Sequence, residues 1–257
     1  MTPESLKECA GLLLDVGGVL YQGDEAISGS VAAFARLKAS GLPFRLLTNT
    51  TRTTRAALAE RLAALDFDVT AADIVTPASV AAAILDANGA RPHLLVHPDL
   101  LPDCPPEADA PNAVLLGDAG EYFTFDRLNR AFEILIEGGR LYALGRNRFF
   151  RGVNGLELDA GPFVAALEYA SGIEARLIGK PSPDFFRAAA AAFSLPSESV
   201  LMVGDDLEAD VTGAREAGLA AALVCTGKYR KGDAMIAKKG GAHVAASFAE
   251  LVDEFLD

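Results

Sequence analysis

The stretch from Leu12 to Leu20 constrains the fold of this chain more than any other. Its apolar run, Leu12-Leu13-Leu14, is typical of a strand that is buried on both faces. The run ends at Asp15, and the glycines at 17 and 18 let the backbone turn sharply there. Asp15 is therefore predicted at the carboxyl end of a strand, the edge where open α/β sheets bind ligands. A carboxylate in this position is a candidate nucleophile or metal ligand; the alternative is a turn-forming Asp, which is common at strand ends.

Further strands alternate with helices along the chain. Apolar runs at residues 44–47 and 200–203 predict two more buried strands, and a shorter strand is predicted at 176–178. Segments of helical spacing lie between the strands, including 54–65 and 184–193. This alternation predicts an α/β fold with a doubly wound parallel sheet that helices cover on both faces.

Residues 74–176 repeat the same alternation and are predicted to form a second α/β domain inserted into the first. Thr76-Pro77 breaks the chain before an alanine-rich helix. The segment 102–111, rich in Pro and Asp, is predicted as a loop. The predicted core domain therefore consists of residues 1–73 and 177–257, with the insertion between them.

Composition narrows the classes of partner. The 257 residues carry a formal net charge of −12, which disfavours general binding to nucleic acid or to an anionic membrane surface. The three cysteines lie far apart without a CxxC pair, so neither a disulfide framework nor a zinc site is indicated. No apolar run approaches membrane-spanning length, and the first residues lack the apolar core of a signal peptide. A cytoplasmic location is therefore expected, and the lysine-containing segment 228–239 is interpreted as a solvated basic surface.

Polar residues that could take part in catalysis or metal binding follow several of the predicted strands. They are Asp15, Thr48 with Asn49, Lys180, and the acids Asp205, Asp206 and Asp210. Several acids and one lysine at one edge of a sheet fit a divalent cation and a phosphoryl group held between them. Mg²⁺ prefers oxygen ligands and is usually bound by one or two carboxylates together with substrate phosphate oxygens. Lysine and hydroxyl groups then neutralise and orient the remaining phosphoryl oxygens.

The order of these motifs resembles the haloacid dehalogenase-like superfamily of aspartate-nucleophile phosphatases. The matching motifs are Asp15 to Val19, Thr48, Lys180 within Gly179 to Pro183, and Gly204-Asp205-Asp206. The large insertion between the second and third motifs is similar to the C2-type cap of the nitrophenylphosphatase-like subgroup. The resemblance covers essentially the whole chain and implies a Rossmann-like core with an α/β cap.

The resemblance also implies roles at the predicted phosphoryl site. Asp15 would attack phosphorus and form an aspartyl-phosphate that water then hydrolyses. Thr48 and Lys180 would hold the phosphoryl oxygens, and Asn49 would help to position the phosphoryl group or the rest of the substrate. The implied activity is that of a Mg²⁺-dependent phosphohydrolase acting on a small phosphorylated substrate.

A metal site is implied at the same place. Mg²⁺ would be bound by Asp15, by the backbone carbonyl of Gly17 and by Asp205. Asp206 or Asp210 would lie next to the metal ligands without touching the metal, or would bind the metal through water.

The first motif departs from the family pattern at Gly17, where the usual residue is an Asp that acts as general acid and base. Glycine transfers no proton, so substrates with stable leaving groups, such as pyrophosphate, phosphoramidates and aryl phosphates, are favoured over simple alkyl phosphates. The same departure motivates the alternative of a catalytically impaired protein that binds a phosphorylated ligand or partner. Dehalogenation is disfavoured because the water-excluding site that it requires would not call for this many acidic residues. Schiff-base cleavage of carbon–phosphorus bonds is disfavoured because residues 74–176 contain no lysine.

The inserted domain offers candidates for substrate selection. Arg146, Asn147 and Arg148 are predicted to contact the substrate, the alternative being a solvated turn. The segment 116–120, Leu-Gly-Asp-Ala-Gly, looks like the fourth motif but lacks its acid pair, and a glycine-rich turn explains it without a site. Similar capped proteins often dimerise through the cap, so a homodimer is expected.

Overall fold

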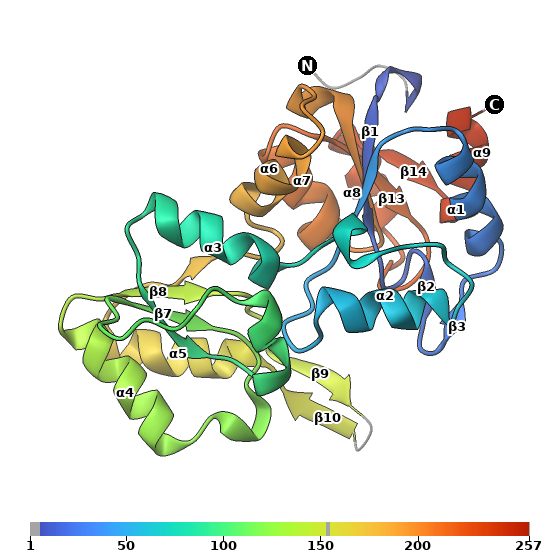
Figure 1. Cartoon of the computed structure of the whole chain (residues 1–257). Helices are drawn as coiled ribbons and strands as arrows, with labels where there is room; N and C mark the ends of the chain where they lie inside the picture. Colours follow the sequence, from blue (N-terminus) through green and yellow to red (C-terminus); the bar gives the residue numbers. More distant parts are fainter. Residues whose placement is uncertain (1–5, 153–154, 257) are drawn as a thin grey trace. The chain divides into compact units, whose positions relative to one another are not determined.

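A computed structural model describes residues 6–152 and 155–256. Their contacts divide the chain into two compact units (Figure 1). The first comprises the described residues of Met1–Thr48, Arg55–Val75 and Lys180–Asp257, and the second comprises those of Asn49–Thr54 and Thr76–Gly179. This division differs from the expected one in the segment 49–54, whose contacts lie with the second unit, and the second unit runs over 76–179 where 74–176 was expected.

The first unit is built on a six-stranded sheet of order β14-β13-β12-β1-β4-β5, in which every neighbouring pair is parallel. Its strands are β1 (Gly11–Asp15), β4 (Phe44–Leu47), β5 (Ile74–Val75), β12 (Val200–Gly204), β13 (Ala220–Val224) and β14 (His243–Ala245). All residues of β1, β12 and β13 are buried, as expected for continuous apolar strands in a covered parallel sheet. Parallel strands share one direction, so their carboxyl ends meet at one edge.

Helices cover both faces of this sheet. Leu12 and Leu14 of β1 pack in one cluster with Phe34 and Leu62, which come from helices on the same face. Figure 1 shows helices α6 and α7 on the other side of the sheet from α1 and α9. The helices of this unit are α1 (Ser30–Ala39), α2 (Arg55–Ala63), α6 (Pro183–Ala191), α7 (Gly213–Glu216), α8 (Asp233–Lys239) and α9 (Phe248–Leu256). The doubly wound core predicted from the alternation of strands and helices is confirmed.

Two local features of the first unit were not predicted. The segment after β12 begins with a π-helical turn, η6 (Leu207–Thr212), and becomes α-helical at α7. Single π turns are frequent at functional sites. The short strands β2 (Tyr21–Gln22) and β3 (Glu25–Ala26) form an antiparallel hairpin after the glycine turn that follows β1.

The second unit has a parallel sheet of its own, with the order β11-β8-β7-β6. These strands are β6 (Pro92–Leu95), β7 (Ala113–Leu116), β8 (Arg140–Ala143) and β11 (Arg176–Leu177). Alternate side chains of β7 point to opposite faces, so that Leu115 packs in one cluster with Leu85 while Leu116 packs in another with Ile134. The helices are α3 (Pro77–Ala87), which contributes to the first cluster, and α4 (Phe125–Ile136) and α5 (Ala160–Ser171), which contribute to the second.

Side-chain caps define where two of these helices begin. Thr76 accepts a hydrogen bond from the backbone N–H of Ser79 at the start of α3, and Thr124 does so for Arg127 at the start of α4. An antiparallel hairpin, β9 (Phe149–Gly152) and β10 (Gly155–Leu158), precedes α5 and was not predicted. Over the described residues, no helix combines the length and the apolar character needed to cross a membrane.

Candidate active site

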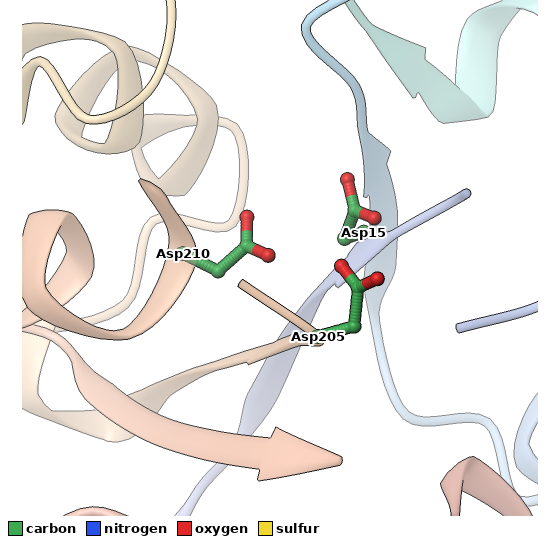
Figure 2. Close-up of side chains that lie close together, drawn as sticks. All are labelled: Asp15, Asp205 and Asp210. Atoms are coloured by element: carbon green, nitrogen blue, oxygen red, sulfur yellow. The ribbon is translucent and has the colours of Figure 1, made fainter. Parts of the chain in front are cut away.

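Three acidic side chains meet at the carboxyl edge of the first unit's sheet. Asp15 ends β1, Asp205 directly follows β12, and Asp210 lies in η6. One carboxylate oxygen of each lies within 4.8 Å of the others, and all three residues are buried. Figure 2 shows the three carboxylates converging from these separate elements. The structure thus brings together Asp15, Asp205 and Asp210, three of the residues named from the sequence.

Lys180 lies among these acids. Its Nζ is 2.5 Å from Asp15 Oδ1 and 2.7 Å from Asp210 Oδ1, and it also donates to the backbone oxygen of Leu47 at 3.3 Å. The residue is only 6% exposed. Burial alone would lower the pKa of Lys180, but the two carboxylates outweigh it and raise that pKa, so the ammonium stays charged.

The acids carry more negative charge than Lys180 neutralises. Burial raises the pKa of Asp15 despite the attraction of Lys180, and the neighbouring charge of Asp205 raises it further. Burial likewise raises the pKa of Asp205 and of Asp210 to about 6 in each case, and Asp210 adds to the shift at Asp205. Buried carboxylates that repel one another in this way favour a bound cation.

Two glycines leave space for the carboxylate of Asp205. A Cβ atom at Gly18 would lie 2.0 Å from Asp205 Oδ2, and one at Gly227 would lie 1.9 Å from the same atom. Both glycines have positive φ angles, +85° and +58°. A third close approach occurs behind Asp210, where a Cβ at Gly204 would lie 2.3 Å from its carboxylate. The acid positions therefore depend on backbone that only glycine supplies.

The other predicted residues of the first two motifs occupy different settings. Thr48 follows β4, is half-buried, and donates its backbone N–H to Val75 at 3.2 Å. Asn49 groups with the second unit, where its side chain packs against Gly179. Gly17 is exposed, and no described atom lies within 4 Å of the position that a Cβ would take there.

Asp206 does not join the three-acid cluster, although it was proposed from the sequence as one of the metal-site residues. Its Oδ1 accepts hydrogen bonds from the backbone N–H groups of Glu208 and Ala209, so the carboxylate caps η6. Burial alone would raise the pKa of Asp206, but these bonds and the charge of Lys228 lower it. Asp206 therefore holds η6 in place, and η6 carries Asp210.

Lys228 was missed by the sequence analysis, which interpreted 228–239 as a solvated surface. Its backbone N–H donates to Asp205 Oδ2 at 2.6 Å, and its Nζ lies 3.3 Å from Asp206 Oδ2. Just before it, the Thr226 hydroxyl donates to the backbone oxygen of Gly18 at 2.5 Å. The position of Lys228 in the sequence could have identified it as a site residue, because Thr226-Gly227-Lys228 follows the end of β13 and thus lies at the same sheet edge.

The predicted selectivity residues of the second unit form an exposed turn before β9. Arg146 pairs with Glu168 of α5 at 2.6 Å, and the backbone oxygen of Asn147 accepts from Gly161 at 2.9 Å. The backbone oxygen of Arg148 accepts from the N–H of Asp159 at 3.4 Å. The turn is therefore tied to the start of α5.

The segment 116–120, interpreted as a glycine-rich turn, contacts the segment that follows the second motif. Asp118 is buried, and its carboxylate lies 3.3 Å from Nε of Arg52. Its backbone N–H donates to the Thr51 hydroxyl at 3.4 Å. These contacts account for the grouping of residues 49–54 with the second unit.

The residues present fit Mg²⁺. Their donors are hard carboxylate oxygens, and their combined negative charge exceeds the positive charge of the Lys180 ammonium. Gly18 and Gly227 leave space for the carboxylate of Asp205. Asp15, Asp205 and Asp210 are the side chains that could hold the ion, and when bound it would supply positive charge next to Asp15.

Comparison with known proteins agrees with this fold and site. Residues 12–102 match the haloacid dehalogenase-like hydrolase family, and residues 177–251 match the HAD-hydrolase-like family. A curated relative matches almost the full length of the chain at 42% identity. The chain belongs to the haloacid dehalogenase-like hydrolases.

That relative is phospholysine phosphohistidine inorganic pyrophosphate phosphatase from Bos taurus, 42% identical over 98% of this chain and 96% of its own length. Among solved structures, 4-nitrophenylphosphatase from Thermotoga maritima is 28% identical, with a TM-score of 0.87 and coverage of 97% of this chain and 98% of that one. Glycerol phosphate phosphatase from Mycobacterium tuberculosis, solved in complex with magnesium, is 27% identical, with a TM-score of 0.85 and coverage of 96% and 78% respectively. The predicted family and the predicted class of fold, with its inserted C2-type cap, are confirmed.

Proposed function

We propose that this protein is a Mg²⁺-dependent phosphohydrolase in which Asp15 is the nucleophile. The observation that carries the proposal is the buried cluster of Asp15, Asp205 and Asp210 around the ammonium of Lys180. A module that only binds a ligand has no need for a buried carboxylate pressed against a lysine and two further acids. The phosphatase names of its relatives support the same reaction class.

The proposed reaction has two steps. A carboxylate oxygen of Asp15 attacks phosphorus, the bond from phosphorus to the leaving group breaks with its electron pair, and an aspartyl-phosphate forms. Water then attacks the same phosphorus, and the carboxylate of Asp15 departs with release of inorganic phosphate. Lys180 and the hydroxyl of Thr48 hold phosphoryl oxygens, and Asn49 helps to position the group. Asp15, Asp205 and the backbone carbonyl of Gly17, with support from Asp210, would hold Mg²⁺, which would supply positive charge that stabilises the transition state.

The substrate class follows from Gly17. No proton donor stands at this position, so the leaving group must depart as a stable anion or already carry its proton. We therefore propose activated phosphates, meaning pyrophosphate, phosphoramidates and aryl phosphates. Arg146, Asn147 and Arg148 are proposed to select among small substrates.

The test measures phosphate release from pyrophosphate, an aryl phosphate and a sugar phosphate, each with Mg²⁺ or with EDTA. We expect Mg²⁺-dependent turnover of the first two and its loss in Asp15→Asn. Asp109→Asn, which alters an exposed carboxylate, is the matched control and is expected to retain turnover. Turnover that persists in EDTA or in Asp15→Asn would contradict the proposal.

A gain-of-function variant tests the argument about Gly17. Because no described atom lies within 4 Å of a Cβ at this position, Gly17→Asp introduces the missing carboxyl group without a steric conflict at Cβ. General acid catalysis typically contributes a factor of about 10² to 10⁴, so we expect sugar-phosphate turnover to rise well above the wild-type rate. Efficient sugar-phosphate hydrolysis by the wild type would mean that another group supplies the proton.

A second candidate function is binding of a phosphorylated ligand or partner without turnover, and the absence of an acid at Gly17 is the observation that favours it. It would be supported if the Mg²⁺-loaded protein bound phosphorylated ligands but released phosphate from none of these substrates. The complete set of Asp15, Thr48, Lys180 and Asp205 favours the enzyme.

Two further proposals concern the protein as a whole. The cysteines Cys9, Cys104 and Cys225 are all free thiols, which supports a reducing, cytoplasmic location that cell fractionation tests. We also propose a homodimer formed through the second unit, because this unit carries most of the exposed large apolar side chains, including Phe125 and Tyr169 at 79% and 94% exposure. Light scattering that gives a monomer at micromolar concentration would refute the dimer.

A further inference from the structure

A polar cavity adjoins the acid cluster in the first unit. It has a volume of about 370 Å³ and is lined by Asp206, Leu207, Glu208, Lys228, Arg230 and Asp233. The backbone N–H of Lys228 binds Asp205 Oδ2 at 2.6 Å, so this cavity is fixed directly beside the proposed metal site. Two cationic side chains contribute to its lining, in a chain whose net charge is −12.

The two ammonium groups near the acids differ in their freedom to meet a substrate. Lys180 is buried between two carboxylates. The side chain of Lys228 is 71% exposed and pairs with Asp206 at 3.3 Å. Exposed ion pairs contribute about 0–1 kcal/mol, so the Lys228 ammonium can turn toward another anion at little cost.

Arg230 adds a second exposed cation. Its backbone N–H donates to Asp233 Oδ2 at 2.8 Å, which fixes the position of its backbone. Within the described chain, its guanidinium forms no ion pair with a carboxylate. It therefore has its charge available to a ligand, and its planar group suits phosphate oxygens.

A charge count shows what these cations could serve. In the acid cluster, Asp15, Asp205 and Asp210 carry three negative charges and Lys180 carries one positive charge; a bound Mg²⁺ would balance the remainder. In the cavity, Lys228 and Arg230 lie among the carboxylates of Asp206, Glu208 and Asp233, so its lining carries one net negative charge. A phosphorylated substrate brings further negative charge, and more still when its leaving group is itself anionic. That additional charge needs cations with exposed side chains.

We propose that Lys228 and Arg230 form a subsite for a second anionic group of the substrate, namely the leaving phosphate of a diphosphate. The inference rests on the proposed function and names the leaving group that the site favours. As the bond to phosphorus breaks, the electron pair passes to the leaving phosphate, and two nearby cations stabilise that charge without transferring a proton. The subsite thus offsets the absence of an acid at Gly17 for this class of substrate.

Acidic residues in the same cavity sharpen the test. Glu208 lines it, and its carboxylate would repel a second phosphate. Neutralising Glu208 should therefore favour the diphosphate, whereas neutralising Lys228 or Arg230 should disfavour it. A merely structural role of the loop would not give opposite signs.

The experiment compares kcat/KM for pyrophosphate and for an aryl phosphate in the full-length protein. In Lys228→Gln and Arg230→Gln we expect the ratio of pyrophosphate to aryl phosphate activity to fall at least about tenfold, as for loss of a charge-assisted contact. In Glu208→Gln the ratio should rise. Lys231→Gln, which removes an exposed lysine outside the cavity lining, is the matched control. An unchanged ratio of the two activities, including one produced by equal falls for both substrates, would overturn the proposal.

An equilibrium measurement separates this inference from the proposed function. Titration calorimetry compares methylenediphosphonate with methylphosphonate as ligands of the Mg²⁺-loaded protein. We expect Lys228→Gln to weaken the first ligand more than the second. If the wild type turned over none of the substrates, the proposed function would fail while this comparison still tested the subsite; equal weakening of both ligands, or of neither, would overturn the subsite.

Discussion

Replacement of Lys180 by methionine probes the electrostatics of the site without changing the size of the side chain greatly. The ammonium is buried, and it lies 2.5 Å from Asp15 and 2.7 Å from Asp210. Its removal leaves two buried carboxylates without their cation. Breaking a buried ion pair by removing one partner costs about 3–5 kcal/mol, so we expect the free energy of unfolding to fall by that amount in metal-free protein at about pH 8.

The assay is urea unfolding in EDTA, followed by circular dichroism. Added Mg²⁺ should recover part of the loss, because it returns positive charge to the same carboxylates. The double variant Lys180→Met/Asp210→Asn should be more stable than Lys180→Met alone, since one of the orphaned charges is gone. Lys228→Met is the matched control; its side chain is exposed, so the expected loss is about 0–1 kcal/mol. A loss below about 1 kcal/mol for Lys180→Met would refute the reasoning.

Three further outcomes follow from the same geometry. Gly227→Ala would bring a Cβ to 1.9 Å from Asp205 Oδ2, so we expect Mg²⁺ affinity, measured by calorimetry, to weaken at least about tenfold. The raised pKa values of Asp205 and Asp210, about 6 against an ordinary 3.8, contribute stability at low pH that is lost as pH rises through about 6. Metal-free protein should therefore become less stable between about pH 4 and 7, and Mg²⁺ should raise the melting temperature more at pH 7 than at pH 5; the opposite pH trend would contradict these shifts. Gly161→Ala would place a Cβ 2.5–2.6 Å from the backbone oxygens of residues 146–147, and we expect a loss of about 1–3 kcal/mol by thermal unfolding.

The parts of the fold that were predictable are those whose residues repeat one physical signal. Continuous apolar runs marked β1 and β12, because strands covered on both faces exclude polar side chains. The carboxyl ends of parallel strands meet at one edge, so the sequence alone could bring Asp15 and Asp205 together. Lys180 joins them from a loop; its place after a predicted strand made it a candidate, and the resemblance to a family supported its role.

The parts that escaped prediction depend on tertiary contacts or on unusual backbone. The π turn of η6 departs from helical periodicity and gains its cap from Asp206. The hairpin of β9 and β10 escaped prediction because its apolar side chains Phe149, Leu156 and Leu158 are exposed and do not mark a buried face. Lys228 looked like one of several surface lysines, and its contact with Asp205 is made through the backbone, which side-chain patterns do not report.

The central claim is that Asp15 becomes phosphorylated during turnover. The most direct test mixes the Mg²⁺-loaded protein with an aryl phosphate, quenches the reaction with acid within the first turnover and identifies the modified peptide by mass spectrometry. We predict a phosphorylated peptide containing Asp15 that forms before steady-state phosphate release and is absent in EDTA. Phosphate release without any such intermediate, or phosphorylation of a different residue, would contradict the account.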